Sequence, residues 1–406
     1  MAQRGDRIPI EIDGRIVELS SPDRVYFPER GETKLDLARY YLAVGDGIVR
    51  ALHDRPTMLH RFPKGVDGPK VHQKRLPAGA PPWVETCEIY FPRYGRTADE
   101  LCVTSAADVI WAVQMSTVEF HPWNSRRFDV EKPDEWRIDL DPMPGVEWAQ
   151  IVSVAGIVRE VLVDHGLTAW PKTSGSRGFH IYTRIAPRWP YPKVRLAAEA
   201  VAREVQRRAP ELATSRWWKE ERGARVFVDF NQNAKDRTVA STYSVRALPD
   251  ARVSTPLHWD EVPDCRPELF TVDTVPARYA EIGDPWADID ATTSGLDGLL
   301  QLADDLGPAE KAPKADKAPL IEIARTRTRE EAMAALDTWR AAHPDVSTVL
   351  TPTDVLVDGM RGPSSIWYRI RINLQHVPED QRPAQGELLA DYSPWEGYSG
   401  NQWRRG

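Results

Sequence analysis

The sequence predicts an α+β fold, because segments of two different periodicities occur in a chain that can bury a sizeable core. Residues 8–20 (IPIEIDGRIVELS) alternate isoleucines before an Asp-Gly turn, which is the pattern of a two-stranded hairpin. Residues 149–165 and 193–208 instead carry apolar side chains at helical spacing. Hydrophobic residues make up 41% of the 406 residues, enough for one large or two ordinary domains.

Charge and cysteine content exclude several classes of protein. The net charge of -7, with 28% charged residues, argues against a uniformly basic surface but leaves room for a local basic groove. Three cysteines without CxxC spacing indicate neither a disulfide framework nor a zinc ribbon. Residues 1–13 lack an apolar signal core, and no run approaches the about 18 apolar residues of a membrane span. We therefore expect a cytoplasmic protein with no membrane partner.

A helix is predicted after the hairpin, with Thr33 as its N-cap and apolar residues at helical spacing from Leu35 to Val44. Arg24 and Lys34 flank the polar loop that joins the hairpin to this helix. By default, such residues are solvated surface charges.

The next segment, residues 55–76, is basic and has aromatic and histidine rings interleaved. It holds six basic residues, with Asp54 and Asp67 as the nearby acids. A nucleic-acid backbone and its base faces require this mixture, whereas an exposed solvated loop is the alternative. The residues that this hypothesis singles out are Phe62, Lys70, His72 and Lys74.

Apolar spacing predicts a largely buried helix from Ser105 to Phe120, ended by His121-Pro122-Trp123. A single histidine after a helix is by default a capping or core residue. It becomes a candidate for function only through the motifs that follow it.

The stretch Trp136–Pro142 (WRIDLDP) carries the most specific pattern in the chain. On a strand, Asp139 and Asp141 share one face, and Pro142 ends the strand. Two carboxylates held this close repel each other unless a cation lies between them, and Mg²⁺ binds carboxylate oxygens together with substrate phosphates. The alternative is a strand end with two solvated acids.

A glycine-rich turn lies within residues 173–185 (TSGSRGFHIYTRI), after a short strand at Trp170–Lys172. Gly175 and Gly178 allow backbone N–H groups to converge on an anion. Ser174, Arg177 and His180 are the polar side chains of this stretch that we single out, the first two as further donors. It is not a Walker loop, because the GxxxxGK[ST] pattern is absent. A tight hairpin with no ligand is the alternative.

Asp229 lies inside the aromatic and β-branched strand Arg225–Phe230. A carboxylate there is costly unless it is paired or bound to a metal. We expect a hairpin return through Val239–Val245 that leads to Arg246, followed by an irregular region over residues 256–288.

The C-terminal part has a different composition. Residues 307–318 are rich in Ala, Pro and Lys, which is typical of a linker. A helix over Glu330–Ala342 precedes an extended tail whose aromatic residues should anchor it, namely Trp367, Tyr368, Trp395 and Trp403. We expect a catalytic domain over residues 1–300, a linker over 301–318, and an extension over 319–406 docked on the core.

Taken in order, these motifs resemble the polymerase domain of bacterial DNA ligase D, a branch of the archaeo-eukaryotic primase superfamily. The resemblance runs from about Glu18 to about Asp288 and is similar to the stand-alone primase-polymerase C group of actinobacteria. It includes His121-Pro122-Trp123. The other motifs are Asp-Leu-Asp-Pro (139–142), Thr-Ser-Gly-x-x-Gly-x-His (173–180), Val-Asp-Phe-x-Gln-Asn (228–233) and Tyr-Ser-Val-Arg (243–246).

The resemblance implies a fold and a metal site. The fold would be a catalytic module with an RRM-like antiparallel sheet, packed against a smaller N-terminal α/β module with the active site in the cleft. Asp139, Asp141 and Asp229 would hold two Mg²⁺ or Mn²⁺ ions. The chemistry of nucleotidyl transfer needs such a pair to activate a 3′-hydroxyl and neutralise pyrophosphate.

The resemblance also implies substrate contacts. Ser174, His180 and Arg246 would contact the nucleotide triphosphate, with Arg177 nearby. The same pocket would be lined by Arg222 and Gln232, and His121 would lie near the sugar. Arg24, where the family often has Lys, and Lys34 would bind the 5′-phosphate across a DNA gap.

One departure concerns the basic segment. The family usually presents an aromatic pair there that stacks on template bases, and Val71-His72 aligns with that pair. Either His72 and Phe62 replace it, with Lys70 and Lys74 on the DNA backbone, or this protein grips the template differently.

The function implied is template-directed addition of nucleotides, with ribonucleotides preferred, to a 3′ end at short gaps with a downstream 5′-phosphate. Its partners would be gapped or nicked DNA, an NTP or dNTP, and a DNA ligase or another end-repair protein. A primase that makes primers de novo is one alternative, and a non-catalytic DNA-end-binding scaffold is another. The intact set of three acids argues against the scaffold.

Overall fold

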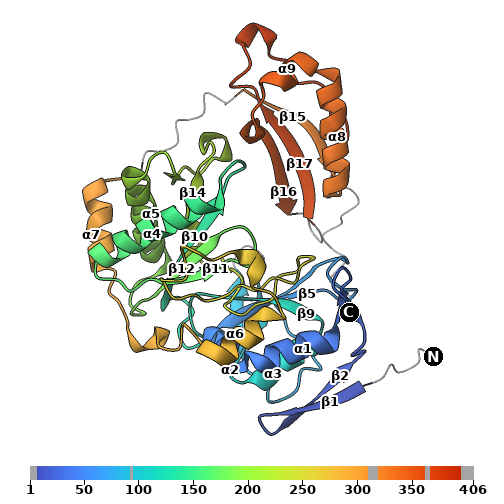
Figure 1. Cartoon of the computed structure of the whole chain (residues 1–406), viewed down its shortest axis with the longest axis vertical. Helices are drawn as coiled ribbons and strands as arrows, with labels where there is room; N and C mark the ends of the chain where they lie inside the picture. The colour runs from blue at the N-terminus through green and yellow to red at the C-terminus, as the bar shows by residue number, and fades with distance from the viewer. Residues whose placement is uncertain (1–6, 92–94, 310–318, 362–365, 395–406) are drawn as a thin grey trace, which may run out of the picture. The chain divides into compact units, whose positions relative to one another are not determined.

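The computed structural model describes residues 7–91, 95–309, 319–361 and 366–394 (Figure 1). The chain forms two compact units, each with its own hydrophobic core. It passes between them more than once, because two short internal segments belong to the second unit. Unit 1 comprises residues 1–142, 147–215 and 226–307, and unit 2 comprises 143–146, 216–225 and 308–406.

The first of the two five-stranded sheets of unit 1 is mostly antiparallel, and only its last pair, β13–β14, is parallel. Helices α4 (Trp148–Asp164) and α5 (Tyr191–Arg208) lie beside each other and pack against it (Figure 1). Its strands, in spatial order, are β11 (Trp170–Thr173), β12 (Phe179–Arg184), β10 (Glu135–Pro142), β14 (Val226–Asp229) and β13 (Ala213–Thr214). This arrangement confirms the predicted α+β class and both predicted helices.

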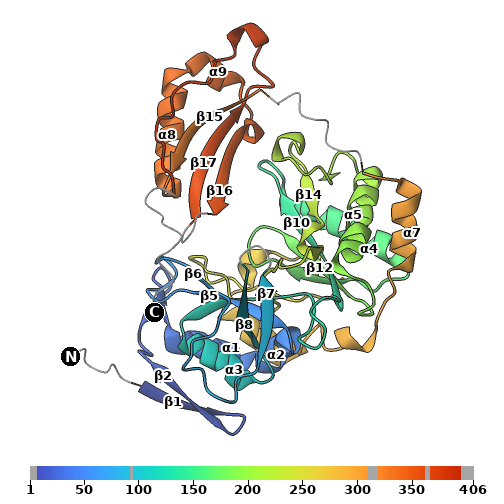
Figure 2. The same cartoon turned by 180° about the vertical axis from the view of Figure 1, so that it is seen from behind.

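The second sheet of unit 1 is built from residues nearer the N-terminus, as the smaller predicted module requires. Figure 2 labels four of its strands. Their order is β6 (Val71–Gln73), β5 (Pro56–Arg61), β8 (Arg96–Cys102) and β7 (Thr86–Phe91), with β9 (Thr117–Pro122) also paired to β5. Its helical partners are α1 (Lys34–Ala43), α2 (Gly45–Leu52) and α3 (Ala106–Gln114), whose apolar residues form one core with it.

The N-terminal hairpin and the first helix start where the sequence predicts. Strands β1 (Arg7–Ile12) and β2 (Arg15–Ser20) pair in antiparallel register around a turn at Asp13 and Gly14, whose φ angles are 51° and 69°. Those positive values are the ones that a two-residue hairpin turn needs. Thr33 caps α1 in a capping box with Asp36, after the short pair β3 (Val25–Phe27) and β4 (Glu32–Thr33).

The predicted helix Ser105–Phe120 is wrong in its second half. Helix α3 ends at Gln114, and the chain reverses at Ser116, whose φ is 76°. Residues 117–122 then form β9 along β5. Apolar spacing could not separate a buried helix from a buried strand here, and pairing with β5 decided in favour of the strand. His121 therefore lies in a strand and caps no helix.

The predicted hairpin return over Val239–Val245 is also wrong. These residues form turns, and the only regular feature among them is a single bridge between Val245 and Val253. The region 256–288, predicted to be irregular, contains helix α6 (Thr274–Ile282). A further helix, α7 (Asp297–Leu306), packs on α5.

The described part of unit 2 holds a three-stranded antiparallel sheet and two α-helices, one of which confirms the predicted helix at 330–342. The tail that was predicted to be extended contains two strands, with Trp367 and Tyr368 in the second, but also a short helix; Trp395 and Trp403 lie outside the described residues. Docking of this part on the core stays a prediction, as do the boundaries at 300 and 318. The elements are β15 (Leu320–Thr326), α8 (Arg329–Ala342), α9 (Pro344–Val349), β16 (Val355–Arg361) and β17 (Ile366–Asn373), with sheet order β15-β17-β16.

Among the residues that the structure describes, no helix combines the length and the apolar character needed to cross a bilayer.

Candidate active site

Three carboxylates meet at the centre of the first sheet of unit 1. Asp139 and Asp141 alternate along β10 and therefore share one face, while the buried Leu140 between them faces the other way. Strand β14 runs antiparallel to β10 and ends at Asp229, in register with Asp139. Ligand atoms of the three acids lie within 4.8 Å of one another. The structure thus brings together the three acids that the sequence singled out.

The electrostatics of this cluster favour a bound cation. Burial and the charge of Asp229 raise the pKa of Asp139 to about 7. The positive charges of Lys172 and Arg246 act in the opposite direction without cancelling these effects. Oxygen ligands from several carboxylates are the donor set that Mg²⁺ and Mn²⁺ accept. The residues present therefore fit a divalent ion, whose charge would relieve the repulsion between the acids.

Asp229 is oriented by the short turn that follows it, Asn231–Asn233. Its Oδ1 accepts hydrogen bonds from the Asn231 backbone N–H (2.8 Å) and from Asn231 Nδ2 (3.2 Å). Its Oδ2 accepts one from Gln232 Nε2 (2.8 Å). Gln232, predicted to line the nucleotide pocket, thus also holds the third acid in place.

His180 and Lys172 extend the site on the other side of Asp139. The register places His180 of β12 opposite Asp139, and Lys172 of β11 opposite His180. His180 Nε2 lies 3.3 Å from Asp139 Oδ1. Burial, together with the charge of Lys172, holds the pKa of His180 well below its usual value.

The sequence reasoning missed Lys172. Its side chain is fully buried, and its Nζ donates to the Ala240 carbonyl (2.9 Å) and to Ser254 Oγ. Burial and the nearby charge of Arg246 hold the pKa of Lys172 well below its usual value. A lysine within a short apolar strand, two residues before Ser174, was the signal that could have identified it.

The glycine-rich turn packs closely against neighbouring segments, and two of its backbone N–H groups are already hydrogen-bonded within the turn. Ser174 Oγ accepts hydrogen bonds from the backbone N–H groups of Ser176 and Gly178, each at 3.1 Å. A Cβ on Gly178 would lie 2.1 Å from the Leu140 carbonyl oxygen, and one on Gly175 would lie 2.6 Å from Arg246 Cγ. The glycines therefore let the turn sit on β10 and beside Arg246.

An open pocket of about 300 Å³ adjoins the acids and is lined from both sheets of unit 1. Arg246 lines it and is anchored by Nη1, which donates to the Ser174 carbonyl (2.6 Å). Arg222 belongs to unit 2, where its guanidinium donates to the carbonyls of Arg216 and Trp217, so it has no assigned place relative to this pocket. The other predicted residues that line the pocket are Asp139, Asp141, Ser174, Arg177, His180, His121 and Gln232.

The predicted phosphate-binding pair differs in exposure. Arg24 is exposed and donates to the Pro63 carbonyl (2.6 Å). Lys34 is 3% exposed, and its Nζ donates to Ser20 O (3.0 Å) and to Gln114 O (2.7 Å) and Oε1 (3.0 Å). Burial, with the charges of Arg24 and Arg61, lowers the pKa of Lys34 to about 8. Three cations thus lie near one another, which favours an anion beside them.

The predicted DNA-contacting residues of the basic segment differ in their exposure. Phe62 is 3% exposed and belongs to the core, so it offers no ring face for stacking, and that prediction is wrong. Lys70 and His72 are exposed. Lys74 pairs with Asp236 and lies over the Phe91 ring, 4.3 Å from its centroid. His72 therefore remains the candidate for a stacking contact.

The raised pKa of Asp139 gives a stability prediction for the metal-free protein. The folded-state pKa of about 7 exceeds the unfolded value of about 3.9, so ionised Asp139 destabilises the fold increasingly as the pH rises from 4 to above 7. In EDTA, Asp139→Asn should be more stable than wild type at pH 8, by ~2 kcal/mol, with little difference at pH 4.5. Thermal denaturation at both pH values measures this. Equal differences at the two pH values would contradict it.

Comparison with known proteins agrees with this geometry. Residues 33–286 match the family model described as the LigD primase-polymerase domain. The chain is 34% identical over 297 residues to the multifunctional non-homologous end joining DNA repair protein LigD of Mycobacterium tuberculosis, covering 70% of this chain and 38% of that protein. It is 29% identical over 289 residues to LigD of Pseudomonas aeruginosa, covering 70% and 34%. The chain thus spans less than half the length of these relatives.

A solved structure, titled as the polymerase domain from Mycobacterium tuberculosis ligase D in complex with DNA, matches with a TM-score of 0.64 and 32% identity. The match covers 68% of this chain and 99% of that one. It confirms the predicted resemblance and fold. The chain belongs to the LigD primase-polymerase domain family, and the prediction of a nucleotidyltransferase of the DNA polymerase and primase class is confirmed.

Proposed function

We propose that this protein adds nucleotides to the 3′ end of DNA under the direction of a template, with Asp139, Asp141 and Asp229 holding two divalent ions. One observation carries the proposal: three carboxylates from paired strands lie within 4.8 Å of one another beside a basic pocket of about 300 Å³. When bound, two such ions activate the attacking hydroxyl and neutralise the leaving pyrophosphate.

The pocket supplies the nucleotide-binding groups. Arg246, anchored on the Ser174 carbonyl, presents a guanidinium that can bind phosphate oxygens with two donors. Arg177 is exposed at the same pocket and can add a second positive charge. We assign the triphosphate to this side, with Ser174, His180 and Gln232 around it. His121 enters from the other sheet, and we place the sugar there.

The DNA would lie against the exposed groups of unit 1. The similar structure from Mycobacterium tuberculosis is titled as a complex with DNA, and the curated relatives are named for non-homologous end joining. We propose that this chain acts on short gaps with a downstream 5′-phosphate, prefers ribonucleotides, and works with a ligase that seals the product. These substrates would place it with the chromosome in the cytoplasm.

We assign Arg24 and Lys34 to the 5′-phosphate because, together with Arg61, they form a group of three neighbouring positive charges. A terminal phosphate carries close to two negative charges near neutral pH, whereas an internal diester carries one. Lys34 lies in the first turn of α1, where the helix dipole adds to the attraction; the N–H groups of residues 34–36 already donate to Arg24 O, Pro22 O and Thr33 Oγ1. The rival function, priming de novo on single strands, has no need of this site.

The first test concerns the acids. Asp141 is the exposed member of the three, so Asp141→Ala should leave the fold and gapped-DNA binding nearly intact. It should lower nucleotide addition by at least about a hundredfold, because it removes a metal ligand. Extension of a labelled primer with Mn²⁺ and NTPs measures this, and the exposed Asp264→Ala protein serves as the control. Activity of Asp141→Ala within about tenfold of wild type would contradict the two-metal assignment.

The second test concerns the 5′-phosphate. Arg24→Ala should weaken binding to a gap with a 5′-phosphate by roughly tenfold or more, and binding to a 5′-hydroxyl gap much less. Titrations with both gaps measure this, with Arg188→Ala as the matched exposed arginine. Lys34→Ala is less informative, because it also removes three internal hydrogen bonds. Equal losses on the two gaps would favour the primase alternative.

A further inference from the structure

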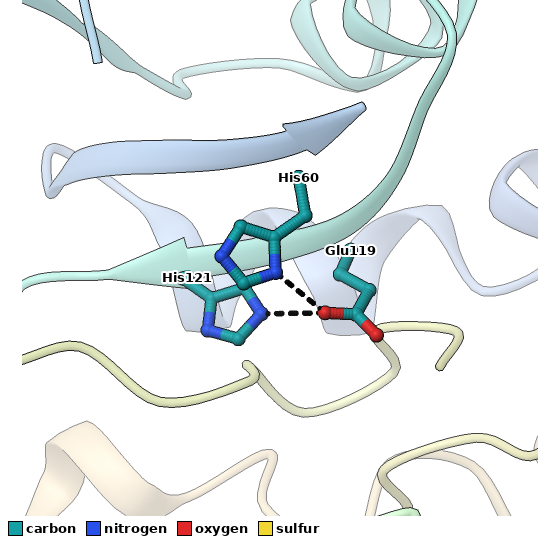
Figure 3. Close-up of side chains that lie close together, drawn as sticks. All are labelled: His60, Glu119 and His121. Atoms are coloured by element: carbon teal, nitrogen blue, oxygen red, sulfur yellow. Dashed lines mark hydrogen bonds and ion pairs between the residues drawn. The ribbon is translucent and has the colours of Figure 1, made fainter. Parts of the chain in front are cut away.

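A second group of ionisable side chains lies beside the nucleotide pocket, on the second sheet of unit 1. Glu119 and His121 alternate along β9 and share one face, and the register places His60 of β5 directly opposite Glu119. All three are less than 8% exposed. Figure 3 shows both imidazole rings directed at the same carboxylate oxygen.

The hydrogen bonds of Glu119 connect this group to the pocket. Oε2 accepts from His60 Nδ1 (2.6 Å) and His121 Nε2 (3.0 Å). Oε1 accepts from the Ala247 backbone N–H (2.9 Å) and from Arg246 Nε (3.3 Å). One buried carboxylate therefore contacts the two residues, His121 and Arg246, that enter the pocket from different segments of the chain.

The ionisation states in this group follow from its surroundings. Burial alone would raise the pKa of Glu119, but the hydrogen bonds from His121 and His60 outweigh it and hold that pKa well below its usual value. Burial lowers the pKa of His121 to about 4 and that of His60 to about 3, despite the opposing effect of Glu119. Near neutral pH, an ionised carboxylate thus faces two neutral imidazoles.

A neutral imidazole carries one ring proton, and the carboxylate decides where it is. Because ionised Glu119 can only accept, His121 Nε2 must hold the proton that is donated to it. His121 Nδ1 is then a hydrogen-bond acceptor on a side chain that lines the pocket. An acceptor at that position can accept a hydrogen bond from a hydroxyl group, but it has no proton to donate to a phosphate oxygen.

We propose that Glu119 is a positioning residue for nucleotide binding, because it fixes the tautomer of His121 and the pose of Arg246 through one carboxylate. The role of these two residues in binding rests on the proposed function. Glu119 itself is not among the residues that line the pocket, and it acts through the two side chains that it bonds.

The same three side chains form a set that could hold a metal ion. The contact lengths favour protons instead. Zinc ligands at tetrahedral distances stand roughly 3.3 Å apart, whereas His60 Nδ1 and Glu119 Oε2 are 2.6 Å apart, which is the length of a charge-assisted hydrogen bond. The other carboxylate oxygen, Glu119 Oε1, already has two N–H donors, Arg246 Nε and the Ala247 backbone.

Positioning and simple electrostatics predict opposite signs for Glu119→Gln. Removing a buried negative charge near a triphosphate should tighten nucleotide binding if charge alone mattered. In the positioning account, the Ala247 N–H keeps the amide oxygen on its side, so the amide NH₂ faces the imidazoles. His121 Nε2 must then accept, its proton moves to Nδ1, and the pocket loses its acceptor.

The kinetic test compares Glu119→Gln with wild type in primer extension. We expect the nucleotide KM to rise by roughly tenfold or more and kcat to fall, with the melting temperature close to wild type. Glu100→Gln is the matched control, because Glu100 is buried in β8, which pairs with β5 in the same sheet, but its carboxylate accepts from Trp123 Nε1. Its kinetics should be unchanged. A lower KM or unchanged kinetics in Glu119→Gln would overturn the proposal.

A spectroscopic test decides the tautomer without any catalysis. The nine histidines can be labelled with nitrogen-15, and His121 assigned by comparison with His121→Asn. We expect the Nε2–H tautomer in wild type and Nδ1–H in Glu119→Gln. The Nδ1–H tautomer in wild type would overturn the proposal. So would a wild-type protein that binds one zinc ion per chain when the Glu119→Gln protein binds none. If the wild-type protein added no nucleotides at all, the proposed function would be wrong. The tautomer measurement would still test the role of Glu119, because it does not depend on activity.

Discussion

The pairing of β10 with β14 is the constraint on which the rest of the site depends. Its register sets Asp229 opposite Asp139, and alternation along β10 adds Asp141 to the same face. A shift by one residue would turn both acids of β10 into the apolar side of the sheet. Leu140, fully buried on that side, holds the register, because a slip would expose it. The packing of the sheet is therefore also what places the charges.

That placement concentrates negative charge, and the surrounding chain supplies two basic side chains beside it. Lys172 comes from β11, and Arg246 comes from an irregular segment that reaches the pocket only through tertiary structure. Arg246 is held from two sides, by the Ser174 carbonyl and by Glu119. Arg246 thus links the glycine-rich turn of one sheet to β9 of the other, and a change on either side should alter how it binds the nucleotide.

Local pattern was enough to predict what lies on regular strands. The face shared by Asp139 and Asp141 follows from alternation, and Asp229 was recognised because it interrupts an apolar run. Glu119 was missed because residues 105–120 have helical spacing, and on a helix Glu119 and His121 would not share a face. Only the pairing of β9 with β5 brings them together. Phe62 shows the converse error, since an aromatic residue in a basic segment proved to belong to the core.

The central claim is that the three acids hold two divalent ions at a nucleotide pocket. Diffraction from crystals soaked with Mn²⁺ and a non-hydrolysable nucleotide, recorded at the manganese absorption edge, tests this most directly. The account predicts two anomalous peaks roughly 3.5–4 Å apart, bridged by Asp139, Asp141 and Asp229, with the triphosphate toward Arg246. A well-ordered nucleotide without manganese at these acids, or manganese bound at His60, Glu119 and His121 instead, would contradict it.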